Sequence, residues 1–567
     1  MNKILLLSSI FAAGLTSAQN YFGSEFIGEG GFNTPSNVYK VNGKILYTGL
    51  LGSSLTGNFP IVHKGGNADG ILASLSPTDG TIQWIKQFGG GADEVVMDVA
   101  TDAAGNYYLT GYFMGAGSLA LDADPGPNVY PLSVPSSFAN RDIFIIKLDT
   151  NGDFLWAKQM STPVGAANDD ATSIELDSAG NIYLAGSFIS VDFDPGPGNQ
   201  LMNATGNSDA FIVKLDNDGN FVWVKTMGGT SNKRIVDMEI DANDDIYVTG
   251  RFQGTIDLNP DATLTDIRTT KGNYDTFVAK YTSSGDYVWG NSWGGSSVDT
   301  PEKLIVNGGK VYVAGEFSGN NVDMDPTAGT NLQSVAGGAG QDGYFSVFGT
   351  DGSYVSTYIV LGITSNGDEM RDIYVDGSGN IYLSGLFQNI TVAGNNYTTA
   401  AANSDIYYLK LDSSLAFKGI YLIQGTNTQA APLITQVSGD TFLGIGATRG
   451  ATAFDYSKPT VTENPSTAQY YTFFSKFDFN ETNLATGEVS GKSKISVYPN
   501  PAVSTVNLKS DNSISSVFIF SLDGKQVYNY KGTDVKTINV SMLTSGMYIL
   551  QTTDNKGNSA QTKLLKK

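Results

Sequence analysis

The chain has 567 residues, which is long enough for more than one domain, and it contains no cysteine, which excludes disulfide bridges and thiolate metal sites. Its net charge of −21 excludes nucleic acid as a partner, because a phosphate backbone would be repelled. A cationic partner, a divalent metal or a neutral glycan fits this charge better. The 67 glycines, 29 tyrosines and 29 phenylalanines favour many short strands joined by tight turns.

Residues 1–18 (MNKILLLSSIFAAGLTSA) are predicted to be a secretory signal peptide. Lys3 provides the basic end, an apolar stretch follows, and Thr16-Ser17-Ala18 is a cleavage site of small residues. The apolar stretch is too short to span a bilayer as a stable anchor. No other run approaches its length, so we expect an exported protein without a transmembrane segment.

From residue 19 to about residue 480, the chain repeats itself at intervals of about 66 residues. One recurring motif is Asp-x-Phe-x-x-Lys-Leu-Asp and its variants, with the best copies starting at Asp142, Asp209 and Asp405. The other is Gly-Asn-x-Tyr-x-x-Gly, with good copies ending at Gly186 and Gly385. Both motifs occur seven times.

Each unit contains four short runs, a to d, with period-two alternation and β-branched or aromatic residues. In the third unit they read ATSIELD, NIYLAGSF, DAFIVKLD and NFVWVKTM. Asp-x-x-Gly turns join run a to run b and run c to run d. Four antiparallel strands repeated radially make a propeller blade, so residues 19–480 are predicted to form a seven-bladed β-propeller.

The two ends of the repeat region complement each other. The last unit has runs a, b and c and then stops, whereas Tyr21–Gly31 (YFGSEFIGEGG) lies where run d would precede the first unit. The prediction is that this N-terminal strand completes the last blade, closes the ring and covers two sheet edges. The alternative is that Tyr21–Gly31 is only an N-terminal arm.

Four of the long connections between runs b and c carry an Asp-Pro motif: LDADPGP, VDFDPGPG, IDLNPDA and VDMDPTA. Two carboxylates spaced two residues apart, together with loop carbonyls, are suitable calcium ligands. The alternative is structural, because an aspartate before proline starts a turn by accepting hydrogen bonds from nearby backbone amides. The candidate binding or metal residues are Asp122, Asp124, Asp192, Asp194, Asp257, Asp261, Asp323 and Asp325.

Three further groups of residues bear on catalysis. Acidic residues near the connections from run d to run a could supply a general acid and base for glycoside cleavage. The favoured interpretation is a solvated acidic rim; these residues are Asp93, Glu94, Asp169, Asp170, Asp299, Asp368 and Glu369. The only histidine, His63, is expected on the solvated surface. Tryptophans at one position of run d are expected to pack between blades rather than to serve as sugar platforms; they are Trp84, Trp156, Trp223 and Trp289.

Residues 481–493 have no apolar period and are predicted to be a linker. Residues 494–567 carry a net charge of about +5, against about −26 for the rest of the chain, which supports a domain boundary. Their short alternating runs, with a hairpin turn at Asp523-Gly524, predict a small Ig-like β-sandwich.

The repeat units resemble the seven-bladed propeller repeats of bacterial secreted proteins known as SBBP repeats. The resemblance rests on the K-L-D-x-x-G-x-x-x-W and G-N-I-Y-L-x-G blocks and on the Gly-Gly that follows the tryptophan strand. It departs in the fifth unit, where Ser356 replaces tryptophan. This family implies a fold and no particular activity.

Residues 494–567 resemble the type A C-terminal sorting domain of the type IX secretion system of Bacteroidota. The resemblance implies recognition by the outer-membrane translocon, usually followed by removal of the domain and by anchoring or release of the cargo. Besides Leu522-Asp523-Gly524 and the stretch Leu543–Tyr548, the matching sorting-signal residues are Tyr498, Pro499, Asn500, Pro501, Gly546, Tyr548, Lys563, Lys566 and Lys567.

The sequence therefore predicts an exported binding module, released or on the cell surface, with a glycan, matrix or protein ligand. Calcium could order its Asp-Pro loops. Two alternatives stay open. An extracellular glycan hydrolase or lyase predicts an acidic pair at the mouth of the ring with a raised pKa. A non-catalytic scaffold predicts no concave pocket.

Overall fold

The computed structural model of the chain describes residues 21–27, 34–41, 43–55, 59–78, 81–115, 117–134, 140–161, 167–335, 340–362, 367–399, 403–449, 452–454, 462–463, 470–479, 495–510, 512–521, 526–555 and 559–567. The predicted signal peptide, the predicted linker and the Asp523-Gly524 turn lie outside the described residues. Within them every regular element is a β-strand, and no helix long and apolar enough to cross a membrane is found.

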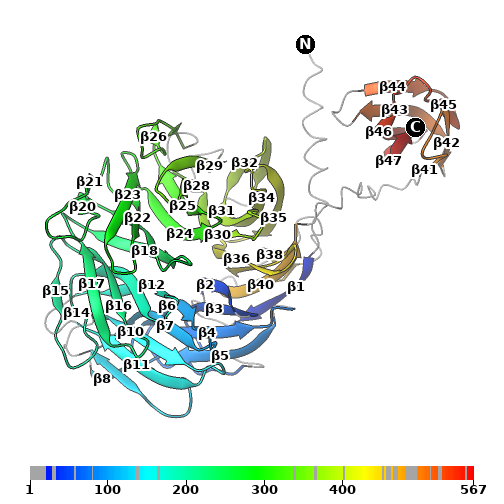
Figure 1. Cartoon of the computed structure of the whole chain (residues 1–567). Coiled ribbons are helices and arrows are strands. Elements are labelled where there is room, and N and C mark those ends of the chain that lie inside the picture. Colours follow the sequence, from blue (N-terminus) through cyan, green and yellow to red (C-terminus); the bar gives the residue numbers. More distant parts are fainter. Residues whose placement is uncertain are drawn as a thin grey trace. The chain divides into compact units, whose positions relative to one another are not determined.

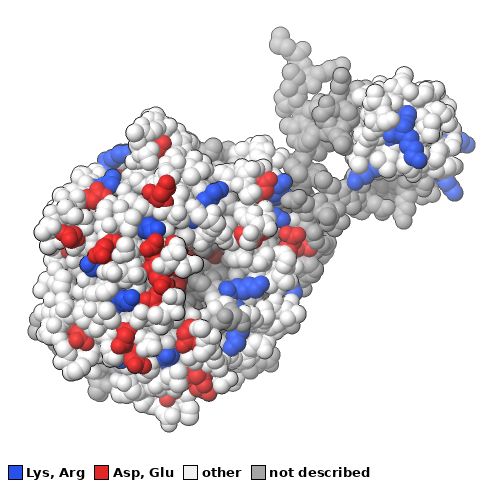
Figure 2. All heavy atoms as spheres, viewed as in Figure 1, with Lys and Arg blue, Asp and Glu red and all other residues white. Residues whose placement is uncertain are grey.

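The chain divides into two compact units, one comprising Gln19–Phe479 and the other containing Asn480–Lys567. On the face shown in Figure 2, acidic and basic side chains are interspersed over the larger unit, whereas the charged side chains visible on the smaller unit are basic.

The larger unit is built from antiparallel sheets that contain four strands each in the order a-b-c-d, consistent with propeller blades (Figure 1). We number these sheets 1 to 7 by their a strands. Sheet 1 is β2 (Thr34–Val41), β3 (Lys44–Leu51), β4 (Asp69–Leu75) and β5 (Ile82–Phe88); sheet 2 is β6 (Glu94–Thr101), β7 (Tyr107–Met114), β10 (Arg141–Leu148) and β11 (Phe154–Met160); sheet 3 is β12 (Asp170–Leu176), β13 (Ile182–Phe188), β16 (Asp209–Leu215) and β17 (Phe221–Met227); sheet 4 is β18 (Lys233–Ile240), β19 (Ile246–Phe252), β22 (Asp275–Tyr281) and β23 (Tyr287–Trp293).

The remaining sheets differ at their outer edges. Sheet 5 is β24 (Thr300–Asn307), β25 (Lys310–Ser318), β28 (Gln341–Gly349) and β29 (Tyr354–Gly362), extended by β32 (Asn389–Val392) and β33 (Asn395–Thr398); sheet 6 is β30 (Glu369–Val375), β31 (Ile381–Phe387), β34 (Asp405–Leu411) and β35 (Phe417–Gly425), extended by β38 (Thr452–Ala453) and β39 (Thr462–Glu463); sheet 7 is β36 (Ala430–Ser438), β37 (Thr441–Thr448), β40 (Tyr471–Asp478) and β1 (Tyr21–Ile27).

Sheet 7 combines the two ends of the larger unit. β1 pairs with β40 in antiparallel register, so that Glu25 lies opposite Phe474 and Ile27 lies opposite Thr472. The N-terminal strand thus occupies the d position that the last unit lacks. Gly28–Gly31, the rest of the predicted segment, lie outside the described residues.

The Gly-Asn-x-Tyr-x-x-Gly motif has a backbone explanation. Its first glycine, Gly180 in sheet 3, closes the turn from a to b with φ of +80°, a conformation that disfavours side chains. Its last glycine, Gly186, lies against a bulge in strand β12. A Cβ at Gly186 would lie 2.0 Å from the carbonyl oxygen of Asp170, so no other residue fits.

Apolar side chains fill the space between consecutive sheets. One buried cluster joins Tyr183 and Ile212 of sheet 3 to Ile235 and Phe277 of sheet 4, and an equivalent cluster lies between each other pair of consecutive sheets. A further cluster joins sheet 1 to sheet 7, and it includes Tyr47, whose ring centroid is 5.4 Å from that of Phe474. Neither face of a sheet is left to solvent along its central strands, which explains the nearly continuous apolar runs of the c strands.

The long connections between b and c form small hairpins that tie neighbouring sheets together. They are β8 (Gly117–Asp122) with β9 (Pro131–Val134), β14 (Ser190–Asp192) with β15 (Leu201–Asn203), β20 (Thr255–Asp257) with β21 (Ile267–Thr269), and β26 (Val322–Asp323) with β27 (Leu332–Gln333). Each hairpin contacts the residues that follow strand d of the preceding sheet, through bridges such as Gly89 to Asp122 and Gly294 to Asp323. In the β14–β15 hairpin the contact is a hydrogen bond from the N–H of Asp192 to the carbonyl of Ser161. In sheets 5 and 6 this link becomes regular pairing, which accounts for their extra strands.

The smaller unit contains two antiparallel sheets around one apolar core, as a β-sandwich requires. One sheet is β41 (Ile495–Tyr498), β42 (Thr505–Ser510) and β45 (Thr537–Asn539); the other is β44 (Gln526–Lys531), β43 (Ile514–Ser521), β46 (Gly546–Asp554) and β47 (Ser559–Lys566).

Candidate functional sites

The Asp-Pro loops have the geometry of backbone-binding turns. In each loop, Oδ1 of the first aspartate accepts two backbone N–H groups; for Asp192 these come from Asp194 at 3.1 Å and Gln200 at 2.7 Å. The second aspartate caps the next turn, as Asp194 does by accepting the N–H of Gly196 at 2.8 Å. The same pattern holds for Asp122 and Asp124, for Asp257 with Asn259 and Asp261, and for Asp323 and Asp325. This geometry favours the turn interpretation.

Within the described residues no three carboxylate, histidine or cysteine side chains are grouped so that they could hold a metal ion. Calcium binding by these loops therefore stays a prediction, with backbone carbonyls needed to complete the ligand set. In the third loop Asn259 takes the place of the second aspartate and still accepts an N–H, from Asp261 at 3.0 Å. An amide oxygen is thus sufficient for the turn.

We expect millimolar calcium to raise the melting temperature of the full chain if the loops bind it, because a ligand of the folded state stabilises that state. The matched variant is Asp192→Asn with Asp194→Asn, which keeps the acceptors of the turn and removes the charges. Differential scanning calorimetry with and without calcium measures both proteins. An equal response of variant and native chain, or no response at all, counts against calcium in these loops.

The tryptophans of strand d pack between sheets, as the packing interpretation predicts, and Trp84 in addition lines a groove. All four are half-buried, and each ring lies against the glycine of the c–d turn in the next sheet. A Cβ at Gly219, for example, would lie 3.0 Å from the ring of Trp156. Three of the rings make an edge contact with a tyrosine of their own sheet, whereas Trp84 contacts Tyr107 of sheet 2, at 5.7 Å between centroids.

A groove of about 500 Å³ lies beside Trp84, between sheet 1 and the c–d turn of sheet 2. Its lining includes Lys44, Gln83, Thr150 and Asn151. A second groove, of about 420 Å³, lies between the a–b turns of sheets 2 and 3. Both grooves are on the side of the short turns. The Asp-Pro loops, which carry the predicted binding residues, line neither groove.

The acidic residues near the d–a connections do not form a solvated rim, and that interpretation is wrong for most of them. Glu94, Asp169, Asp299 and Asp368 are at most 1% exposed, and Asp170 is also buried. Asp93 and Glu369 are half-buried. Asp170 pairs with Arg234 at 3.0 Å. The other four buried carboxyls face the aspartate at the start of strand c of the preceding sheet, which is the first residue of the recurring Asp-x-Phe motif. Burial of that aspartate was the missed feature.

Six junctions between consecutive sheets share this arrangement. At each junction, the first residue of strand a or the residue just before it donates its N–H to the carbonyl that precedes the strand-c aspartate. The distance is 2.9 Å from Asp299 to Tyr274 and 3.1 Å from Lys233 to Ser208. The residue in this position is Glu94, Asp169, Lys233, Asp299, Asp368 or Gln429. The facing aspartate is Asp69, Asp142, Asp209, Asp275, Asp342 or Asp405.

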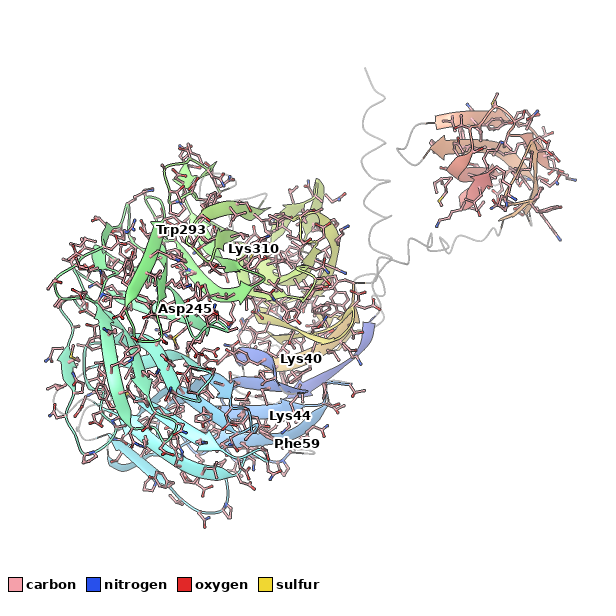
Figure 3. All side chains as sticks on the ribbon, in the orientation of Figure 1. Lys40, Lys44, Phe59, Asp245, Trp293 and Lys310 are labelled. Carbon is pink, nitrogen blue, oxygen red and sulfur yellow. The ribbon has the colours of Figure 1, made fainter. Side chains whose placement is uncertain are left out.

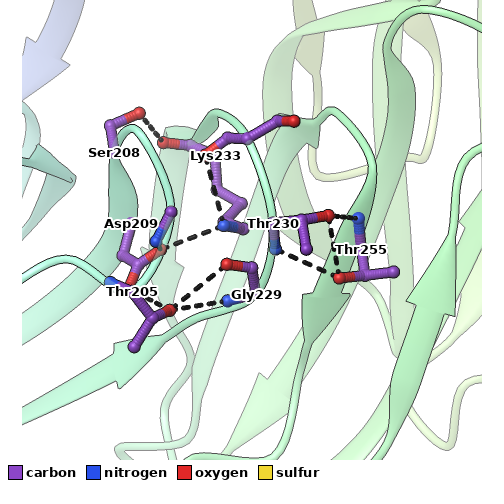
Figure 4. A network of polar contacts seen from close by, with 9 residues as sticks. Thr205, Ser208, Asp209, Gly229, Thr230, Lys233 and Thr255 are labelled. Atoms are coloured by element: carbon purple, nitrogen blue, oxygen red, sulfur yellow. Dashed lines mark hydrogen bonds and ion pairs between the residues drawn. The ribbon is translucent and has the colours of Figure 1, made fainter.

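One junction uses a lysine where four others use an acid. The Lys233 ammonium lies 3.0 Å from Oδ1 of Asp209, and both side chains are almost fully buried (Figure 4). The other carboxyl oxygen of Asp209 accepts the N–H and hydroxyl of Thr205. At this junction the charge of Asp209 is therefore compensated by Lys233, and both carboxyl oxygens of Asp209 accept hydrogen bonds.

The acid pairs lack that compensation. Oδ1 of Asp275, Oε1 of Glu94 and Oδ2 of Asp368 are buried and accept no hydrogen bond within the described residues. Burial raises the pKa of Asp275 to about 6, that of Asp299 and of Asp368 to about 7, and that of Glu94 to about 9. Near neutral pH, protons on these carboxyls supply the missing donors.

His63 is not on the solvated surface, so that expectation is wrong. Its side chain is 16% exposed, and Nε2 lies 3.9 Å from Oδ1 of Asp69. The loop before strand β4 turns the ring inward, toward the junction of sheets 1 and 2. A single imidazole beside a buried carboxyl does not make a multi-histidine metal site.

The a strands carry a second buried charge cluster around Lys303. The Lys303 ammonium lies 3.2 Å from Oδ2 of Asp237, and that oxygen also accepts the N–H of Leu304 at 2.8 Å. Asp98 and Asp372 are bound in the same way, by the N–H groups of Ile174 and Ile434. Burial opposes the charge of Lys303, but Asp237 and Asp98 outweigh it and hold the pKa of Lys303 above its usual range. The sequence pattern gave no sign of this cluster.

A third cluster surrounds Arg371 where strands β24 and β30 begin. Its guanidinium contacts Glu302 at 2.9 Å and Glu369 at 2.6 Å. Glu316 lies nearby, and burial raises its pKa to about 7. One oxygen of Glu316 accepts the amide of Gln341 at 2.8 Å.

In the smaller unit, the sorting-signal residues come together from both ends of the sequence. The Asn500 side chain donates to the carbonyl of Lys563 at 2.7 Å and accepts the N–H of Leu565 at 2.8 Å. The Tyr498-Pro499-Asn500-Pro501 segment is thereby fixed to strand β47, close to Lys566 and Lys567. Tyr548, two residues after Gly546, is buried and donates to the carbonyl of Thr544 at 2.8 Å. Tyr498 is 52% exposed.

Residues 496–567 match the family described as secretion system C-terminal sorting domain (Por_Secre_tail). This domain indicates export through the type IX secretion system to the cell surface. The match covers the smaller unit.

The repeat region has distant relatives. The chain is 23% identical over 304 residues to regulatory protein FlaEY of Caulobacter vibrioides, which covers 51% of this chain and 30% of that protein. It is 24% identical over 214 residues to the uncharacterized WD repeat-containing protein L264 of Acanthamoeba polyphaga mimivirus, covering 33% of this chain and 15% of that one. The chain thus spans less than a third of these curated relatives.

Among solved structures, the chain is similar to the extracellular domain of the putative one component system BT4673 of B. thetaiotaomicron. The identity is 11% and the TM-score is 0.18, with 94% of this chain and 80% of that chain covered.

Proposed function

We propose that this chain is a cell-surface or released binding module, a closed seven-bladed β-propeller exported by its C-terminal sorting domain. The match of residues 496–567 to the sorting-domain family carries the export part of the proposal. A glycan, matrix or protein ligand fits an exported protein whose described residues hold surface grooves. The proposal includes that the repeats are of the SBBP type, as their resemblance implies.

Three observations support ring closure. Strand β1 pairs with β40, an apolar cluster joins sheet 1 to sheet 7, and the a strands β2 and β36 contact each other as consecutive a strands do. A ring of blades also explains why sheet 7 takes its outer strand from the other end of the unit, because closure protects both sheet edges.

The burial of the acidic pairs supports binding rather than catalysis. A general acid must reach a substrate oxygen, directly or through one water. Glu94, Asp299 and Asp368 have raised pKa values, as the hydrolase alternative requires, but they are enclosed between sheets. Neither described groove is lined by any of them.

The export role has a direct test in a bacterium with a type IX system. We expect the native chain at the surface or in the medium, and a chain truncated after residue 493 retained inside the cell. Asn500→Ala should reduce export, because it removes the two hydrogen bonds that fix the Tyr498–Pro501 segment to β47. Cell fractionation and immunoblotting measure the distribution.

Lys536→Ala, at a solvent-exposed lysine of the same unit, is the matched control and should be exported normally. Undiminished export of the truncated chain would contradict a sorting role for this domain.

A second candidate function, a glycan hydrolase, would use Glu316 as its general acid, because its pKa of about 7 suits neutral pH. Glu316 is 9% exposed, whereas Glu94, Asp299 and Asp368 are at most 1% exposed. Half-buried Glu369 lies in the same cluster and would be the second carboxylate. Release of reducing ends from polysaccharides by the native chain, lost in Glu316→Gln, would establish this activity. The absence of such release from a panel of acidic and neutral polysaccharides would leave the binding role.

A further inference from the structure

The groove beside Trp84 differs from the equivalent places in neighbouring sheets in the side chains that lie beside the tryptophan. In sheets 2, 3 and 4 the residue opposite the strand-d tryptophan is a lysine, whereas Ser74 lies opposite Trp84. In sheet 3 that lysine, Lys214, contacts Asp177 at 3.0 Å and lies over the ring of Tyr183. Sheet 2 has the same set, Lys147, Asp102 and Tyr108, and these three line the second groove. Beside Trp84 the lining has serine in place of the lysine and includes neither the aspartate nor the tyrosine.

Trp84 also keeps a polar group available. The indole N–H of Trp289 donates to the carbonyl of Thr350 at 3.1 Å. The equivalent carbonyl for Trp84 belongs to Thr150, and it accepts the Lys44 ammonium at 2.9 Å instead. Among the described residues the indole N–H of Trp84 has no acceptor. The groove therefore offers an aromatic ring together with a hydrogen-bond donor.

Lys44 gives the groove its charge. Its ammonium donates to the hydroxyl of Tyr107 at 2.6 Å and to Thr150, both of which are neutral. Among the described residues, none of those that line the groove is acidic, and Lys44 contacts no carboxylate. In a protein of net charge −21, such a lysine is an unbalanced positive charge at a recess. Figure 3 labels Lys44 on sheet 1 and Lys310, its counterpart by position, on sheet 5.

We propose that this groove binds a saccharide that carries a carboxylate, a uronic acid residue within a glycan chain. The apolar face of the pyranose packs on the Trp84 ring, the carboxylate pairs with Lys44, and the amides of Gln83 and Asn151 bind hydroxyls. The volume of about 500 Å³ accommodates one or two sugar rings. The inference rests on the proposed binding role and specifies its ligand class and its place.

Calorimetric titration of the full chain with tetra- to hexagalacturonate tests the proposal, with neutral cello-oligosaccharides of equal length as the comparison. We expect the acidic saccharide to bind and to perturb tryptophan fluorescence. Lys44→Met should weaken binding by tenfold or more, and Trp84→Leu should abolish it. Lys310→Met, at the corresponding site of sheet 5, should bind as the native chain does. Melting temperatures report whether each variant folds.

Three results would overturn this assignment. They are equal affinity for neutral and acidic saccharides, an equal loss of affinity in Lys44→Met and Lys310→Met, and no binding by the native chain. The binding role itself fails separately, if the exported native protein retains neither cell-surface glycans nor surface proteins in a pull-down. If the Lys44→Met and Trp84→Leu variants still retain glycan in the pull-down, the binding role holds but the ligand binds at another site.

Discussion

The free energy of unfolding of the larger unit should fall by about 3 kcal/mol or more between pH 5 and pH 8. Folding raises the pKa of Asp275, Asp299, Asp368 and Glu94 above the values of about 4 in an unfolded chain. The folded state therefore binds protons that the unfolded state releases. The stabilisation is complete below pH about 4 and is lost as the pH rises through 6 to 9, by up to ~1.4 kcal/mol per group and pH unit.

The turn aspartates act in the opposite direction at lower pH. Hydrogen bonds from Asn106 and Asn181 hold the pKa of Asp102 and of Asp177 below its usual range, although burial works against this. Their contribution is present above pH about 4 and is lost below it. Maximum stability is thus expected near pH 4, where both groups of carboxyls contribute.

Urea titration monitored by tryptophan fluorescence measures this, because all five tryptophans lie in the larger unit. The matched variant is Asp299→Asn, whose amide can donate to the unpaired oxygen of Asp275. In this variant the free energy of unfolding should depend less on pH above pH 6, because one titrating carboxyl has been removed. Stability that stays constant or rises from pH 5 to pH 8 would show that the acid pairs are not protonated in the folded protein.

Lys233→Met should destabilise the larger unit by about 3–5 kcal/mol, because it leaves Asp209 as an uncompensated charge between two sheets. The pair is buried on both sides, with 0% and 2% of the side chains exposed. The same urea titration at pH 7 measures the loss. The double variant Lys233→Met with Asp209→Asn should recover part of it, since the second change removes the stranded charge.

Lys86→Met is the matched control. Lys86 lies 3.1 Å from Asp153, a separation similar to that in the buried pair, but Asp153 is 69% exposed. Solvent screens such a pair, so the expected loss is below about 1 kcal/mol. Similar losses in Lys86→Met and Lys233→Met would mean that burial does not set the strength of the Lys233 pair.

The β-strand repeat could be predicted because its motifs contain the residues that the local backbone conformation requires. Gly180 marks a left-handed turn, Gly186 marks a bulge contact, and the alternation of apolar residues marks each strand. The pairing of Tyr21–Ile27 with β40 followed from counting strands in the last unit. The hairpins inside the long loops were missed, because their strands of two to six residues are too short to show a period.

The candidate sites were harder to predict, because they depend on what faces a residue from another sheet. Asp299 and Asp325 look alike in sequence, as small acids near glycines. Asp299 is buried against Asp275, whereas Asp325 caps an exposed turn. The open space beside Trp84 depends on Ser74, whose significance appears only when its partner in the strand pairing is known. A motif search registers residues that recur, whereas this groove results from residues that depart from the repeat.

The pairing of β1 with β40 has a consequence for biogenesis. These strands are separated by about 450 residues of chain, so their contact is among the least local in the molecule. Strand β1 therefore has no pairing partner until nearly the whole larger unit has been synthesised. Sheet 7 can acquire its outer strand only in a late step of folding, after β40 has been made.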